Sequence, residues 1–123
     1  MGARINFIFD DGSESLPVLY SHWGANSYVR DLSLAFDHAS ARWGDEQYWV
    51  RMVVSYLLKN ELMNATGYGI YAISRAELSA DCFHDSVVHI DIHGRAVHSL
   101  DTGESMEISD SGKLLQNFEV VSL

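Results

Sequence analysis

The fold is decided first by residues 4–20, which run RINFIFDDGSESLPVLY. Ile5, Phe7 and Phe9 recur at a period of two, the spacing that places side chains on one face of a β-strand. An Asp-Asp-Gly-Ser turn signal follows, and the apolar run after it has the composition of a returning strand. The segment predicts an N-terminal β-hairpin. Because Pro17 has no N–H to donate, we expect the second strand to begin there or to lie at a sheet edge.

A second hairpin is predicted at 86–92 and 96–100, where apolar and polar residues alternate on either side of a glycine-containing turn. Residues 68–73 and 106–108 also have the composition of strands. Periodicity does not decide whether 114–121 forms a closing strand or a short helix.

Two amphipathic helical patterns separate the first hairpin from the later strands. The first runs to about Ala41 and can be capped by Asn26 or Ser27. The second begins after Asp45 and runs to about Asn60. Its apolar stripe includes Trp49, so we expect this helix to lie at the centre of the core.

The predicted order of elements is ββααβββ, without the strand–helix–strand alternation of a parallel fold. We therefore expect an α+β fold, with a mainly antiparallel sheet built from two hairpins and two helices packed on one face. No repeat or linker divides the chain, so residues 1–123 are expected to form a single domain.

Composition excludes some functions. The apolar fraction of 47% indicates a packed core. The formal net charge is −9, and residues 61–123 contribute −7 of it, which disfavours direct binding to nucleic acid. No apolar run approaches the ~20 residues of a membrane span, and no signal peptide is visible. With Cys82 as the single cysteine, a cytoplasmic location is expected.

The connector Ser21-His22-Trp23-Gly24 lies between the first hairpin and the first helix. Tryptophan offers a large ring, histidine can change charge near neutral pH, and the helix start after it gathers backbone N–H groups that attract anions. Packing by the tryptophan and ordinary helix capping are the alternatives. Arginines near the helices, at 30, 42 and 51, are the best candidates to hold an anionic group. The predicted ligand-binding residues are His22, Trp23, Gly24, Asn26, Ser27 and Arg30.

A different kind of site is suggested by the second predicted hairpin. His89 and Asp91 alternate with buried-type residues, and a short turn would place His98 of the returning strand on their face. Imidazole and carboxylate groups on one face can act as an acid–base pair or bind a divalent ion. The same alternation is produced by any sheet with one solvated face.

Other motifs are incomplete. Cys82 and His84 form a Cys-x-His pair, but no second cysteine pair exists to complete a structural zinc site. The glycines of 66–69 precede a predicted strand and lack the lysine of a phosphate-binding loop. We therefore expect no metal and no cofactor.

Three ordered blocks carry a resemblance: YSHWG at 20–24, RWGD at 42–45 and TGYGI at 66–70. Together they resemble a family of small uncharacterised proteins encoded by bacteriophages, prophages and some archaeal genomes, over about residues 4–93. That family has no assigned activity to carry over. The resemblance implies a small accessory protein that acts inside a bacterial or archaeal cell.

The leading hypothesis is a phage-type accessory binding protein that captures a small anionic, nucleotide-like ligand or a host protein and so blunts host defence. The alternative is a phosphodiesterase or hydrolase, with or without a metal, that uses His89, Asp91 and His98. A third hypothesis is an acidic inhibitor that presents its C-terminal half to a basic host protein. The oligomeric state is left open.

Overall fold

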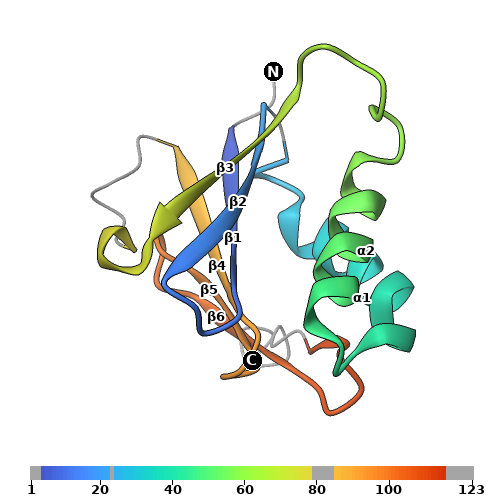
Figure 1. Ribbon diagram of the computed structural model, residues 1–123, viewed down its shortest axis with the longest axis vertical. Coiled ribbons are helices and arrows are strands. Elements are labelled where there is room, and N and C mark those ends of the chain that lie inside the picture. The colour runs from blue at the N-terminus through green and yellow to red at the C-terminus, as the bar shows by residue number, and fades with distance from the viewer. Residues whose placement is uncertain (1–3, 23, 79–84, 116–123) are drawn as a thin grey trace, which may run out of the picture.

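The computed structural model describes residues 4–22, 24–78 and 85–115. Within them a seven-stranded sheet has the order β3-β2-β1-β4-β5-β6-β7 and is accompanied by two α-helices, which confirms the α+β class (Figure 1). The elements are β1 (Ile5–Asp10), β2 (Ser15–Ser21), α1 (Tyr28–Ala39), η1 (Ser40–Arg42), α2 (Glu46–Leu58), β3 (Tyr68–Ser74), η2 (Arg75–Glu77), β4 (Ser86–Asp91), β5 (Ala96–Ser99), β6 (Ser105–Ile108) and β7 (Leu114–Leu115).

The strand pairs are antiparallel except for β1 and β4, which run parallel. The parallel contact between β1 and β4 thus joins the β1–β2 pair to the β4–β5 pair. Beyond them, β3 lies next to β2 at one edge, and β6 and then β7 follow β5 at the other. A parallel neighbour requires a crossover connection. Here the chain crosses β2 and β1 between β3 and β4. The sheet also contains more than two hairpins, because β5–β6 and β6–β7 are antiparallel pairs of successive strands.

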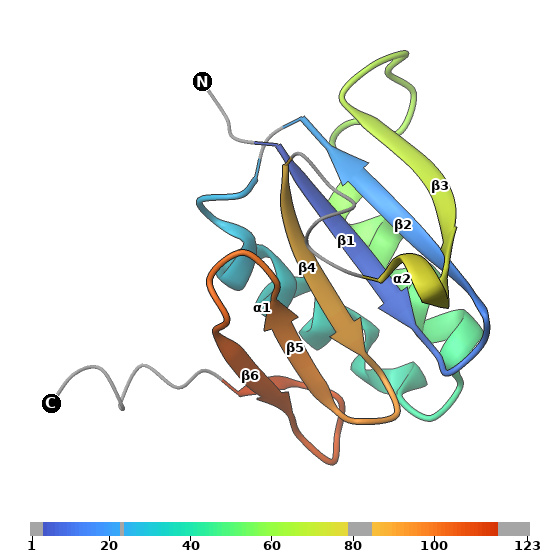
Figure 2. The ribbon, with the colours of Figure 1, turned by 90° about the vertical axis from the view of Figure 1, so that its left-hand side faces the viewer.

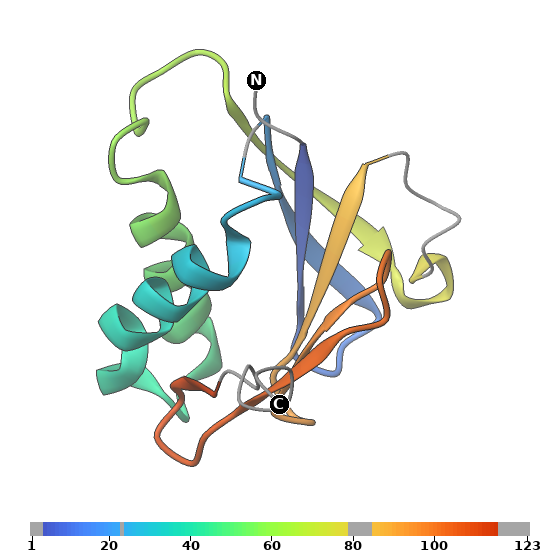
Figure 3. The ribbon, with the colours of Figure 1, turned by 180° about the vertical axis from the view of Figure 1, so that it is seen from behind.

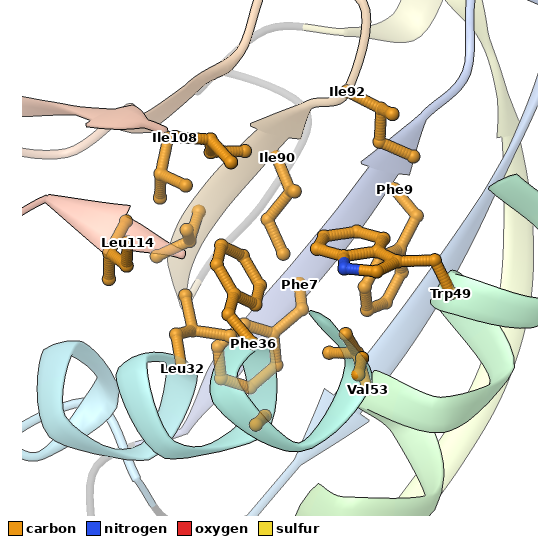
Figure 4. Packing of buried hydrophobic residues seen from close by; sticks show 14 of the residues in the cluster. Phe7, Phe9, Leu32, Phe36, Trp49, Val53, Ile90, Ile92, Ile108 and Leu114 are labelled. Carbon is orange, nitrogen blue, oxygen red and sulfur yellow. The ribbon is translucent and has the colours of Figure 1, made fainter. Parts of the chain in front are cut away.

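Both helices lie on the same face of the sheet, called here the helix face (Figures 1 and 3). Phe7 and Phe9 of β1 meet Leu32 and Phe36 of α1 in the main core. Trp49 of α2 is fully buried among them, as its place in the helical stripe predicts (Figure 4). This apolar contact fixes the helical pair on the sheet.

The opposite face of the sheet, called here the second face, has a smaller core. Ile8, Leu16, Val18 and Val87 are buried there, and Leu78 packs against them. Figures 1 and 3 show η2 on this side, so η2 and Leu78 cover part of the second face. Polar groups buried beside this cluster need partners from within the protein.

The expectation for Pro17 is wrong. The strand begins at Ser15 rather than at Pro17, and it lies between β1 and β3 instead of at an edge. The β1–β2 register ends at the Ile8–Val18 pair. Pro17 therefore stands just beyond the last pair with β1, where its missing N–H interrupts no ladder.

Candidate ligand-binding cleft

Three segments far apart in the sequence, together with Phe7 of β1, line a cleft of about 460 Å³ on the helix face. The first is the end of β2 and the start of α1, the second is the end of α2, and the third is the start of β3. The lining residues are Phe7, Ser21, Gly24, Asn26, Ser27, Arg30, Asp31, Tyr56, Leu57, Lys59, Asn60 and Tyr68. The volume falls within the range of small-molecule sites, and hydroxyl, amide and charged groups converge on it.

Four of the six residues predicted to bind a ligand lie in this cleft: Gly24, Asn26, Ser27 and Arg30. His22 is not among the lining residues. The residue is exposed, its ring and that of Tyr20 form a T-shaped pair, and its backbone N–H donates to the Gly67 carbonyl at 2.9 Å. Trp23, the sixth residue, lies outside the described residues.

Gly24 shapes the entrance to α1. Its φ of +114° lies in the region that favours glycine. The Ser27 N–H donates to the Gly24 carbonyl at 3.1 Å, so the backbone turns tightly into the helix. This turn brings residues 26–30 over the end of β2 and thereby onto the cleft.

Ser27 occupies the N-cap position of α1, but its side chain does not cap the helix. Its hydroxyl donates instead to Asp31 Oδ2 at 2.9 Å. In the predicted cap the Ser27 oxygen would accept a first-turn N–H, but that bond is absent and the hydroxyl is engaged as a donor to the charged carboxylate. The first-turn N–H groups of α1 thus gain no hydrogen bond from the N-cap side chain, and the positive end of the helix dipole faces the cleft region.

Two cations border the cleft. The Arg30 side chain is 75% exposed, and its closest carboxylate contact is Asp31 Oδ1 at 3.5 Å. Lys59 Nζ lies 4.0 Å from the centre of the Tyr56 ring, close enough for a cation–π contact. Both cations can therefore turn toward an incoming anion at small cost, since exposed ion pairs contribute little.

Sequence reasoning missed the residues that α2 and β3 supply, among them Lys59, Asn60 and Tyr68. A signal for the first two was present. Two consecutive helices joined by a short connection pack antiparallel, so the end of the second helix lies beside the start of the first. Tyr68 comes to the cleft through the register of β3, which pairs it with Ser21.

The alternative site residues lie on the second face, away from this cleft. His89 and His98 are directly paired in the β4–β5 register, and their ring centres are 5.7 Å apart. Asp91 shares the β4 face of His89, but its Oδ1 accepts the Gly94 N–H at 2.9 Å and so holds the β4–β5 turn. The structure thus brings His89 and His98 together as predicted, but the carboxylate that hydrogen-bonds His89 is not Asp91.

That carboxylate is Asp10, which is 4% exposed. Its Oδ1 accepts the Gly12 N–H at 2.8 Å and Arg75 Nη2, while its Oδ2 contacts Arg75 Nη1 at 3.2 Å and His89 Nε2 at 2.8 Å. Burial raises the pKa of Asp10, but hydrogen bonds from Arg75, Gly12 and His89 outweigh it and bring the pKa to about 2. Both oxygens are engaged, so Asp10 joins β1, η2 and β4.

Sequence reasoning took Asp10 as part of a turn signal, which it also is, and did not pair Arg75 with it. Arg75 additionally donates to the Ser13 carbonyl at 2.9 Å. It thereby ties the β1–β2 turn to the start of the β3–β4 connection. No local pattern indicates a contact between residues 65 positions apart.

The described residues contain no group of three histidine, cysteine, aspartate or glutamate side chains placed to hold a metal ion. The Cys82 and His84 pair lies outside the described residues. Among the helices of the described ranges, none combines the length and apolar character needed to cross a bilayer.

Comparisons of the chain with protein-family models, curated proteins and solved structures found no match. The functional inference therefore rests on the geometry of the two polar sites.

Proposed function

We propose that the protein binds a small anionic ligand of the nucleotide type in the cleft between the start of α1 and the end of α2. The observation that carries the proposal is the convergence of Arg30, Lys59 and the helix start on one cleft of ligand size. The accessory role of the phage type rests on the resemblance of the sequence blocks alone.

Each part of a nucleotide has a partner of suitable chemistry in this cleft. A phosphate suits the helix N-terminus and the two cations. The side-chain amides of Asn26 and Asn60 can donate and accept hydrogen bonds with a base or a sugar. Tyr56 and Tyr68 supply apolar ring surface beside them. Asp31, already bound by Ser27, disfavours a ligand of high negative charge and favours a single phosphate group.

Isothermal titration calorimetry tests the proposal. The probes are nucleoside monophosphates, cyclic mono- and oligonucleotides, and ADP-ribose. At least one should bind, and Arg30→Ala and Lys59→Ala should each weaken it about 10-fold or more, because hydrogen bonds to charged groups contribute about 1.5–3 kcal/mol. Raising the salt concentration should weaken binding further.

Arg51→Ala is the matched control, because Arg51 is an exposed arginine of α2 that does not line the cleft. It should leave the affinity unchanged. The proposal fails if none of the probes gives heat, or if Arg30→Ala and Lys59→Ala bind the ligand as tightly as Arg51→Ala and the unaltered protein do.

A histidine-dependent hydrolase is the second candidate, and one observation favours it. The Asp10 carboxylate orients the His89 ring through Nε2 at 2.8 Å, an arrangement that leaves the other ring nitrogen to act as a base. Hydrolysis of model phosphodiesters should then fall by 100-fold or more in His89→Gln and His98→Gln. Equal rates in both variants and the unaltered protein would eliminate this candidate.

A further inference from the structure

β3 lies at one edge of the sheet and, among the described strands, pairs with β2 alone (Figure 2). The His22 N–H bonds the Gly67 carbonyl and the Arg75 N–H bonds the Glu14 carbonyl, which fixes the phase of the ladder. Because hydrogen-bonded positions alternate in an antiparallel pair, the odd-numbered residues of β3 direct their backbone N–H and C=O groups toward β2. Ile70 and Ala72 direct their N–H and C=O groups toward the outer edge.

This edge lacks the features that usually prevent strand pairing. Its seven residues, YGIYAIS, contain no proline, lysine or other charged residue, and the register with β2 runs through all of them without a bulge. Ile70 is 69% exposed and Tyr71 is 40% exposed. Leu62 is 63% exposed and borders the same shallow surface as Ile70.

We propose that β3 pairs antiparallel with β3 of a second copy of the chain, so that two sheets join across a two-fold axis at Tyr71. In this register Ile70 of each copy opposes Ala72 of the other, and each opposed pair exchanges two backbone hydrogen bonds. The large Ile70 side chain of one copy then lies beside the small Ala72 side chain of the other. Pairing beyond this stretch is limited because the Ser74 N–H already donates to Glu77 Oε1 at 2.7 Å.

The β3 edge is self-complementary in this register, which favours a second copy as the occupant. Each chain carries a formal net charge of −9, so two copies repel one another over most of their surfaces. β3 is an uncharged stretch, and self-pairing in this register places no like charges directly opposite each other. The two-fold axis places the two Tyr71 residues at a close, non-hydrogen-bonded position. Each Tyr71 hydroxyl donates to Asn6 Oδ1 of its own chain at 2.7 Å, so the ring extends over the sheet toward β1 and away from the edge that pairs.

Sedimentation velocity over a range of protein concentrations tests the proposal, with Ile70→Lys as the disruptive variant. The unaltered chain should form a concentration-dependent dimer that strengthens with added salt, since salt screens the net repulsion. Ile70→Lys should shift the dimer dissociation constant upward by 10-fold or more. Leu34→Lys, at an apolar α1 position that is 45% exposed, should leave it unchanged.

The register is tested by oxidative cross-linking in a Cys82→Ser background. Tyr71→Cys should yield a covalent dimer, whereas Ile70→Cys should not, because residue 70 and its own copy lie on a diagonal too long for a disulfide. Circular dichroism confirms that each variant is folded. A chain that stays monomeric at every concentration, or a dimer that survives Ile70→Lys, overturns the proposal, as does cross-linking at position 70 but not 71.

Discussion

At the scale of single residues, Asp10 is the charge on which the second face depends most. It is buried, both of its oxygens accept hydrogen bonds, and its partners come from three elements. Breaking a buried pair by removing one partner costs more than the pair itself contributes, because the remaining charge stays desolvated. Asp10 therefore stabilises the fold whether or not His89 takes part in a reaction.

The depressed pKa of Asp10 makes this contribution depend on pH. The pKa is about 2 in the folded protein against 3.8 ordinarily, so the stabilisation is fully present above about pH 4 and is lost as the pH falls toward 2. The shift corresponds to about 2 kcal/mol. Asp10→Asn should lower the free energy of unfolding at pH 7 by about this amount, measured by urea denaturation, and the deficit should shrink toward pH 2.

Asp110→Asn is the control for this titration. Asp110 is 91% exposed and pairs with Arg95 at the surface, where an ion pair contributes less than about 1 kcal/mol. Parallel pH–stability curves for Asp10→Asn and the unaltered protein between pH 4 and 2 would show that the Asp10 interactions do not stabilise the folded state.

At the scale of elements, sequence periodicity predicted the helices and most strands because those signals are local. The alternation in β1 and the stripe containing Trp49 each reflect burial of one face against the core. The face shared by His89 and His98 was also predicted, since a hairpin register follows from its turn. The predicted Ser27 side-chain cap is not formed, and the bond that the Ser27 hydroxyl donates to Asp31 instead leaves no periodic signal in the sequence.

Two turn glycines, Gly103 and Gly112, have similar positive φ angles but differ in the space around them. Gly112, in the β6–β7 turn, has a φ of +83°, and a Cβ there would lie 2.7 Å from the Trp43 ring. Gly103 has a φ of +81° with no atom within 4 Å of such a Cβ. Gly103→Ala should cost about 1 kcal/mol for the left-handed backbone. Gly112→Ala should cost about 1–3 kcal/mol more from overpacking.

Thermal and urea unfolding of both glycine variants measure this difference. It isolates the contact between the β6–β7 turn and Trp43, a residue whose ring centre lies 5.2 Å from that of Trp49. Equal costs at the two positions would mean that the turn does not press on the aromatic cluster.

At the scale of the whole molecule, the strand order is what sequence reasoning could not supply. Each hairpin is a local unit, but the parallel contact between β1 and β4 joins residues about 80 positions apart. No periodicity encodes which strands of different hairpins become neighbours. The candidate cleft was half predicted for the same reason: Gly24 to Arg30 form one local segment, whereas Lys59 and Tyr68 reach it only through the tertiary fold.

The overall arrangement separates the two polar sites. The cleft lies on the helix face, and the Asp10–His89 cluster lies on the second face, so binding at one site and chemistry at the other can be distinguished by position. The β3 edge adds a third surface: Ile70, Tyr71 and Ala72 line neither site, although Tyr68 at the start of the same strand lines the cleft. Each proposal can therefore fail without the others.

The central claim, that the cleft on the helix face is the ligand site, is tested most directly by an NMR titration of the ¹⁵N-labelled protein with the nucleotide panel. We predict that the backbone amide signals of Ser27, Arg30 and Asn60 shift in a saturable manner, while those of His89 and His98 stay in place. Saturable shifts confined to the two histidines, or no shifts at any ligand concentration, would contradict the claim.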